Sequence, residues 1–183
     1  MELRNLLKLV WKQKQILPRV QTFAWRLLRR ALPTGMRAGR FSIHISQFCS
    51  RCGLQEDEFH LFFMCPFARA AWFAAPWFIR TDDLIQGRDF LHSLIIDLLR
   101  MHHPYGSITN ILNFLWCIWK ARNDHLFDRK KHSPSHVYLA SLALTVDTDI
   151  LVTNSADLQD VSKPQAPLIG FLLREPLLEL TYW

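Results

Sequence analysis

Apolar residues recur along most of this chain at intervals of three and four, which is the spacing of one face of an α-helix. Two helices are expected between Leu3 and Ala31, separated at Pro18, because proline fits the first turn of a helix. The second helix has its apolar stripe at Val20, Phe23, Ala24, Leu27, Leu28 and Leu32. Its arginines mostly fall elsewhere, so we expect an apolar inner face and a basic outer face. Trp25 is placed in the core and Trp11 on the surface.

Further helices follow from the same periodicity and from capping signals. Thr34 is a candidate N-cap for a short helix that ends near Arg40. The strongest pattern starts at Ser107 or Thr109 and ends near Asp128, with apolar residues at Ile111, Leu112, Leu115, Trp116, Trp119 and Leu126. The other predicted helices cover residues 66–75, 89–102 and 136–151, and the last of these contains residues of lower helix propensity.

The predicted fold is mainly α: a small helical domain with a Cys3His zinc knuckle-like site, followed by an amphipathic helical extension. We expect the first domain to cover residues 1–78 and a helical connector region to cover 79–155. From Ala156 onward prolines recur without clear periodicity, so residues 156–183 are interpreted as a poorly ordered tail.

Composition supports a packed helical protein inside the cell. Half of the 183 residues are hydrophobic and seven are Trp, enough for a core without disulfides, while only six are Gly. No apolar run reaches the roughly 18 residues of a membrane span, and no signal peptide is evident. We therefore expect no membrane contact and a reducing compartment, nucleus or cytoplasm, in which the four cysteines are thiols or metal ligands.

The net charge of +6 is concentrated at the N-terminal end of the chain. Residues 1–40 contain ten Lys and Arg residues against the single acid Glu2. Such a basic segment favours contact with RNA or DNA, although a solvated basic helix face would give the same pattern. The candidate phosphate-binding residues are Lys12, Lys14, Arg19, Arg26, Arg29, Arg30, Arg37 and Arg40.

Four residues between positions 49 and 65 have the spacing of a metal site, C-x2-C-x7-H-x4-C. They are Cys49, Cys52, His60 and Cys65. Two cysteines separated by two residues can bind one metal from a tight turn, and four N and S ligands without an open position are typical of structural Zn2+. We expect one structural zinc ion per chain. A redox Cys pair is the alternative, but no βαβ pattern surrounds it. Cys117 lies in an apolar stripe and is interpreted as a small buried residue.

Catalytic motifs are absent from the sequence. There is no P-loop, nucleophile elbow, H-E-x-x-H or dinucleotide fingerprint. The acidic pair Asp82-Asp83 and the run Glu56-Asp57-Glu58 are interpreted as helix starts, where carboxylates are favoured by the helix dipole. We therefore expect that the chain is not an enzyme.

Several aromatic and Pro-containing signals accompany the cysteines. They are Trp11, Pro18, Phe23, Trp25, Arg26, Leu32-Pro33-Thr34, Arg40, Cys49-x-x-Cys52-Gly53, Glu56, His60-Leu61-Phe62-Phe63, Cys65-Pro66-Phe67-Ala68-Arg69 and Trp72. Together they resemble the zinc-binding domain of plant non-LTR (LINE-type) retrotransposon reverse transcriptases, over about residues 10–78. The segment Trp116-x-x-Trp119-Lys120-Ala121-Arg122-Asn123 is similar to the connector that follows this domain.

The resemblance implies metal ligands at Cys49, Cys52, His60 and Cys65, and partner domains of the polymerase and RNase H-like kinds. No Tyr-x-Asp-Asp loop and no RNase H-like acidic motif is present, so we expect an isolated fragment or a relic reading frame. The leading hypothesis is a zinc module of retroelement origin that binds RNA or DNA. The alternative is a protein-interaction or spacer module, or a non-functional relic, whose zinc only stabilises the fold and whose Trp-rich helix 107–128 docks on an absent neighbour.

Overall fold

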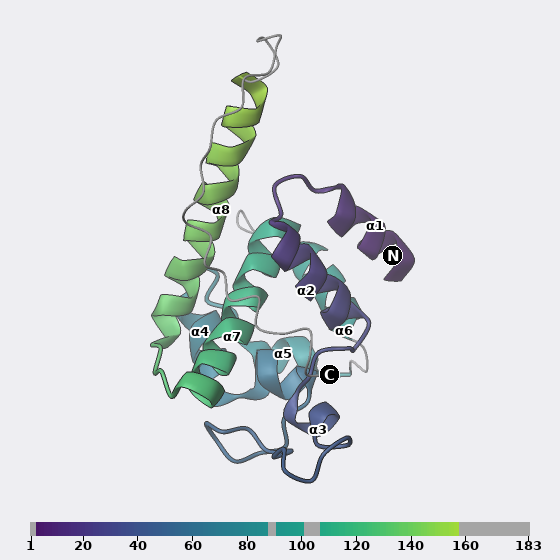
Figure 1. Cartoon of the computed structure of the whole chain (residues 1–183), viewed down its shortest axis with the longest axis vertical. Coiled ribbons are helices and arrows are strands. Elements are labelled where there is room, and N and C mark those ends of the chain that lie inside the picture. Colours follow the sequence, from purple (N-terminus) through teal and green to yellow (C-terminus); the bar gives the residue numbers. More distant parts are fainter. Residues whose placement is uncertain (1–2, 88–90, 101–106, 158–183) are drawn as a thin grey trace, which may run out of the picture.

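The computed structural model describes residues 3–87, 91–100 and 107–157, and within them the chain is mainly helical. In chain order the elements are α1 (Leu3–Lys12), α2 (Pro18–Leu28), α3 (Gly35–Ala38), the π-helix η1 (His60–Met64), α4 (Pro66–Ala74), α5 (Thr81–Ile85), α6 (Leu91–Arg100), α7 (Ile108–Asp128) and α8 (Pro134–Asp157) (Figure 1). The segment between α3 and η1 is mostly turns, with one isolated antiparallel bridge between Phe48 and Gln55.

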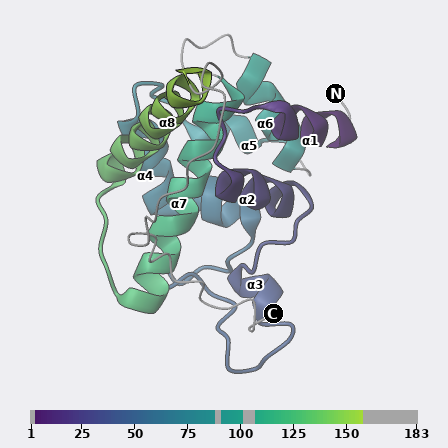
Figure 2. The same ribbon diagram turned by 45° about the horizontal axis from the view of Figure 1, so that its top comes forward.

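Helix α7 lies in the middle of the molecule, with α8 along one side and α2 along the other (Figures 1 and 2). Ser107 caps its N-terminus by accepting a hydrogen bond from the backbone N–H of Asn110. Trp119 is buried, and Trp116 contacts Phe23 of α2 edge-on at 5.4 Å between ring centroids. The expectation that this helix holds its tryptophans ready for an absent neighbour is therefore wrong, because α2 and α8 already cover it.

An aromatic cluster built around Trp72 joins α4, η1 and α7. The Trp72 ring stacks on Phe63 at 5.5 Å and meets Phe114 at 4.6 Å and Trp77 at 5.5 Å between centroids. Aromatic pairs at these separations add to the stabilisation from buried area. The core of the C-terminal helices is thus continuous with the core beneath the cysteine segment.

Helices α1 and α2 form an antiparallel pair at the N-terminal end, as the break at Pro18 predicts. The side-chain amide of Gln21 donates to the carbonyl oxygens of Val10 and Gln13 at the end of α1. Trp25, however, is 42% exposed, which contradicts its expected place in the core. At 100° per residue, Trp25 lies roughly 130° from the centre of the arc formed by the buried side chains of α2, so it faces outward.

Two predicted helices differ in extent from the observed ones. Helix α8 begins at Pro134, where Ser133 accepts from the N–H of His136, and continues to Asp157 instead of covering only 136–151. Residues 156–157, expected in the tail, belong to this helix, and 158–183 lie outside the described residues. Helix α6 is described over Leu91–Arg100, whereas the ends of the predicted helix 89–102 lie outside them. No helix in the described ranges is long and apolar enough to cross a membrane.

Candidate metal centre

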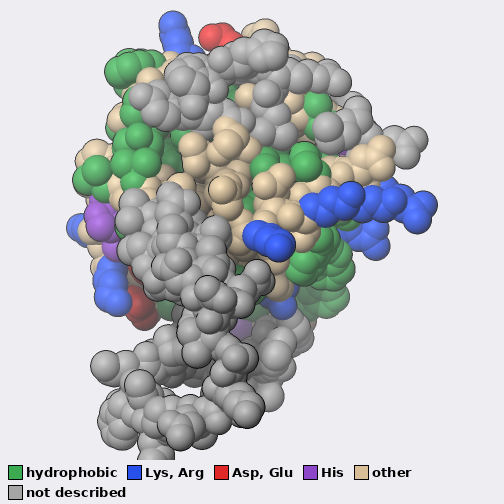
Figure 3. Space-filling model, turned by 90° about the horizontal axis from the view of Figure 1, so that it is seen from above, with side chains coloured by type: hydrophobic (Ala, Val, Ile, Leu, Met, Phe, Trp, Pro, Cys, Tyr) green, Lys and Arg blue, Asp and Glu red, His purple; other side chains and the backbone are tan. Residues whose placement is uncertain are grey.

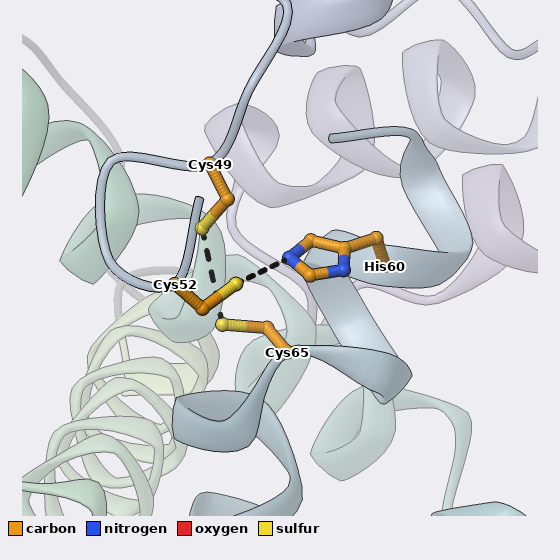
Figure 4. A group of neighbouring side chains, drawn as sticks. All are labelled: Cys49, Cys52, His60 and Cys65. Atoms are coloured by element: carbon orange, nitrogen blue, oxygen red, sulfur yellow. Dashed lines mark hydrogen bonds between the residues drawn. The ribbon is translucent and has the colours of Figure 1, made fainter. Parts of the chain in front are cut away.

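The side chains of Cys49, Cys52, His60 and Cys65 converge on one point (Figure 4). Their three sulfur atoms and one ring nitrogen all lie within 4.8 Å of one another. Cys49 Sγ is 4.0 Å from Cys65 Sγ, and Cys52 Sγ is 3.2 Å from His60 Nε2. Cys49, Cys65 and His60 are buried and Cys52 is partly exposed. The cluster expected from the spacing is therefore assembled.

The first two cysteines lie on a tight turn between two short extended segments. The N–H of Gly53 donates to the carbonyl oxygen of Cys49 at 2.9 Å, and the N–H of Cys49 donates to the carbonyl oxygen of Leu54 at 2.7 Å. Gly53 closes the turn with a φ of +75°, a left-handed conformation that costs glycine little. The backbone thus directs both sulfur atoms toward the same point (Figure 4).

The second pair depends on the π-helical turn η1. His60 and Cys65 are five residues apart, and in an α-helix such residues point roughly 140° away from each other. Here the N–H of Cys65 donates to the carbonyl of His60 at 2.7 Å, an i to i+5 bond that widens the turn. The wider turn brings positions 60 and 65 onto one face, in keeping with the frequent use of π-turns at functional sites.

Side chains outside η1 satisfy the carbonyl groups that the wider turn leaves unpaired. Trp72 Nε1 donates to the carbonyl oxygen of Phe62 at 2.8 Å, and Thr81 Oγ1 donates to that of Phe63 at 2.7 Å. At the other end, Asp57 Oδ1 accepts from the N–H of His60 at 2.7 Å. Because all three bonds involve η1 and its flanks, α4 and the start of α5 hold the ligand pair in place.

The donor set fits a tetrahedral zinc ion. Zinc–sulfur bonds of about 2.3 Å place two sulfur atoms roughly 3.8 Å apart in a tetrahedron, close to the observed 4.0 Å. The hydrogen bond from Cys65 lowers the pKa of Cys49 to about 4 despite its burial. The same contact and burial raise the pKa of Cys65, and burial raises that of Cys52. Three crowded thiols that compete in this way favour a cation between them over three protons.

Glu56 ties the cysteine segment to two other parts of the chain. It is 1% exposed, and its carboxylate accepts from the N–H of Gly35 at 2.9 Å and from Nε of Arg122 at 3.1 Å. Arg122 Nη2 donates to the same oxygen. The helix start expected at 56–58 is confirmed, since Asp57 accepts from the N–H of His60, but Glu56 has the further role of a buried partner of Arg122. Thr34 makes no capping hydrogen bond to α3, and the first N–H groups of α3 instead donate to Glu56: Gly35 to its carboxylate and Met36 to its backbone carbonyl oxygen.

Arg51 makes a second link between the cysteine turn and α7. Its Nη2 donates to the carbonyl oxygen of Ala121 at 3.0 Å, and its guanidinium lies 3.9 Å from the centroid of the Phe67 ring. Its charge interacts favourably with Cys49 and Cys65, although burial lowers the pKa of Arg51. Arg69, four residues after Cys65, pairs with Asp82 in the first turn of α5.

Cys117 does not join the cluster. It is buried in α7, and burial raises its pKa to about 12, which makes the thiol unreactive and a poor ligand. In the described part of the chain, no further group of three or more Cys, His, Asp or Glu side chains has donor atoms close enough for a metal ion.

The predicted phosphate-binding residues lie on the surface. They are spread over the end of α1, the outer face of α2 and the region of α3: Lys12, Lys14, Arg19, Arg26, Arg29, Arg30, Arg37 and Arg40 are all exposed. In the view from above, a row of Lys and Arg side chains extends on the side where Figure 1 shows α1 and α2 (Figure 3). The structure thus groups Arg19, Arg26 and Arg29 on one helix face, whereas Arg37 and Arg40 follow in another segment.

Residues 2–72 match the family model described as zinc-binding in reverse transcriptase. No curated protein and no solved structure matches the chain. The matched region contains the whole Cys3His cluster and ends at Trp72, before α7 begins.

Proposed function

From the match of residues 2–72 to the family model described as zinc-binding in reverse transcriptase, we propose that the chain is a zinc-stabilised helical module that binds RNA or DNA and carries no catalysis of its own. The matched family is the zinc-binding part of such enzymes and not their polymerase. A LINE-type retroelement origin, with polymerase and RNase H-like domains as partners in the parent protein, belongs to the same proposal.

Zinc has a structural role in this proposal. Cys49, Cys52, His60 and Cys65 would hold one ion, and a site with four protein ligands leaves no position for a substrate. The ion would fix the turn segment 47–65 against η1 and α4, a region in which the described structure has little regular hydrogen bonding between backbone groups. Metal binding energy is then folding energy for this segment.

Nucleic-acid binding is supported by the charge of the surface around α2. No Asp or Glu occurs between residues 3 and 55, while eleven Lys and Arg residues do. In the described structure, no carboxylate pairs with Arg26, Arg29 or Arg30. Uncompensated, exposed guanidinium groups on one side of a protein attract polyanions and release counterions when phosphates bind. This surface is the observation that carries the proposal.

A protein-interaction function remains the second candidate, on a different surface from the one expected. The loop between α3 and the cysteine turn exposes Phe41, Ile43 and Phe48, and Leu54 just after the turn is exposed as well. Exposed apolar side chains grouped along one segment are typical of contact sites between proteins. A neighbouring domain would therefore dock on this loop and not on helix α7.

The test compares two charge reversals in the full, zinc-loaded chain. Arg26, Arg29 and Arg30 are changed to Glu in one variant, and Arg129, Lys130 and Lys131, three exposed basic residues after α7, in the other. Both change the net charge equally. We expect the first variant to lose binding to labelled RNA and the second to keep most of it, with affinity of the parent falling steeply as salt rises. Equal loss in both, or no binding by the folded parent at low salt, would contradict the proposal.

A further inference from the structure

From the outward position of Trp25 we propose that α2 carries a base-stacking site for single-stranded nucleic acid, in which Trp25 stacks on an unpaired base and the neighbouring arginines hold the flanking phosphates. The inference rests on the proposed nucleic-acid function. It goes beyond it by naming the strand form that is bound and a residue that contacts bases.

The two sides of α2 differ sharply. Val20, Phe23, Ala24, Leu27 and Leu28 are buried, and Phe23 meets Phe62 of η1 and Trp116 of α7. The opposite side carries Arg19, Thr22, Trp25, Arg26 and Arg29, all exposed. Trp25 is 42% exposed, so part of its ring is open to a ligand on the same side as these arginines.

The neighbours of Trp25 suit a nucleic-acid strand. On a helix, residues three or four apart are neighbours, so Arg29 lies beside Trp25 and Arg26 lies beside Arg29 on the same exposed side. Guanidinium groups bind phosphate in a bidentate manner, and Trp offers a flat ring on which any base can stack. A flat ring beside exposed cations is complementary to a polymer in which phosphates alternate with bases.

Stacking selects the strand form. In a duplex the base faces are already stacked on each other, so an aromatic side chain on a convex helix reaches only the backbone. In a single strand the bases can turn outward and lie on the ring. We therefore expect single-stranded RNA or DNA to bind more tightly than a duplex of equal length, with the difference due to Trp25.

The experiment measures binding of fluorescently labelled oligo-uridine, about ten nucleotides long, and of a double-stranded RNA of equal length by the full zinc-loaded chain. Trp25→Ala is expected to weaken single-strand binding about 5- to 150-fold, while duplex binding changes little. Trp25→Phe should restore most of the affinity. Phe73→Ala, which removes an exposed aromatic ring from α4, is the matched control and should have no effect.

The salt dependence separates stacking from charge. Trp25→Ala should lower the affinity without changing the slope of log affinity against log salt, whereas Arg26→Gln should make the slope shallower by about one. If Trp25→Ala binds single strands as tightly as the parent, the stacking site is disproved, yet salt-dependent binding would leave the proposed function standing. Loss restored by Phe, with thermal stability unchanged, would establish it.

Discussion

The carboxylate of Glu56 and the guanidinium of Arg122 meet in the protein interior, although 66 residues separate them in the sequence. Glu56 lies in the cysteine segment, inside the matched family region, and Arg122 lies on α7, outside it. The family match therefore ends before the residue that neutralises one of its buried charges.

Replacing Arg122 by Met should destabilise the protein by about 3–5 kcal/mol, because it leaves the Glu56 carboxylate buried without a cation. Urea denaturation of the zinc-loaded protein measures this loss. The double variant Glu56→Gln/Arg122→Met should recover part of it, since no buried charge then remains. Lys120→Ala is the control, because its exposed ion pair with Asp124 is worth at most about 1 kcal/mol. A loss of similar size in the Lys120 variant would contradict the special role of the buried pair.

A chain that ends at residue 78 should not fold cooperatively, even with zinc. It would lose Arg122, the Ala121 carbonyl that Arg51 binds, and the Phe114 ring that covers Trp72. Circular dichroism and thermal melting of residues 1–78, compared with residues 1–157, test this expectation. A sharp melting transition of the shorter chain with bound zinc would show that α7 is not needed.

His60→Ala should remove zinc and disorder the cysteine segment. We expect one zinc per chain in the parent and less than stoichiometric zinc in the variant, both measured by elemental analysis. A structural zinc contributes on the order of 10 kcal/mol to folding, and apart from the contacts of Arg51 and Glu56, residues 41–59 have little regular structure to hold them. Hydrogen exchange should then show lost protection between Cys49 and Cys65, with protection retained where α7 packs on α8. Parent-level protection around Cys49 in the variant would mean that zinc does not organise this segment.

Cys117→Ser should leave the zinc content unchanged, because this residue lies in the core of α7 away from the cluster. It should lower the free energy of unfolding by about 1–3 kcal/mol, the usual cost of a buried hydroxyl without a partner. In the native, zinc-loaded parent this thiol should resist thiol reagents, since burial raises its pKa to about 12. Loss of zinc in the variant would contradict the assigned ligand set.

Acid should weaken the junction between α7 and α8 through Asp124. Burial alone would raise the pKa of Asp124, but its hydrogen bonds with His132 and Lys120 outweigh this and hold the pKa below its ordinary value. A carboxyl group whose folded pKa is depressed stabilises the fold above the unfolded pKa and loses that contribution as the pH falls through the folded value. Asp124→Asn should thus reduce stability at neutral pH, and the difference from the parent should shrink below about pH 4. A constant difference down to pH 2 would refute this assignment.

The sequence predicted the parts of the fold that depend on local chemistry. Periodicity and prolines located α2, α4 and α7, and the spacing of four residues identified the cluster that the structure assembles. Trp25 was misplaced because a tryptophan beside apolar residues resembles core, although the period of 3.6 already placed it outside the stripe. That angular test was the signal that could have found it.

Contacts between residues far apart in the sequence could not be predicted in this way. Nothing in the run Glu56-Asp57-Glu58 distinguishes a buried partner of Arg122 from two helix-start acids, because the distinction depends on which element later packs there. The π-turn could not be predicted from the sequence either. Its i to i+5 hydrogen bonding depends on Trp72 and Thr81, whose side chains donate to the carbonyl groups of η1 from later elements. The domain boundaries at 78 and 155 stay predictions.

The π-helical turn also determines where this protein tolerates changes in length. Deleting one residue between His60 and Cys65 would leave a spacing of four, which an ordinary α-helix already brings to one face, whereas adding one residue would give a spacing of six, roughly 240° apart around an α-helix. Insertions near Ile43, which is 94% exposed in a turn, change no donor position. A codon inserted in η1 should therefore do more harm to the metal site than a codon inserted near Ile43, before the cysteines.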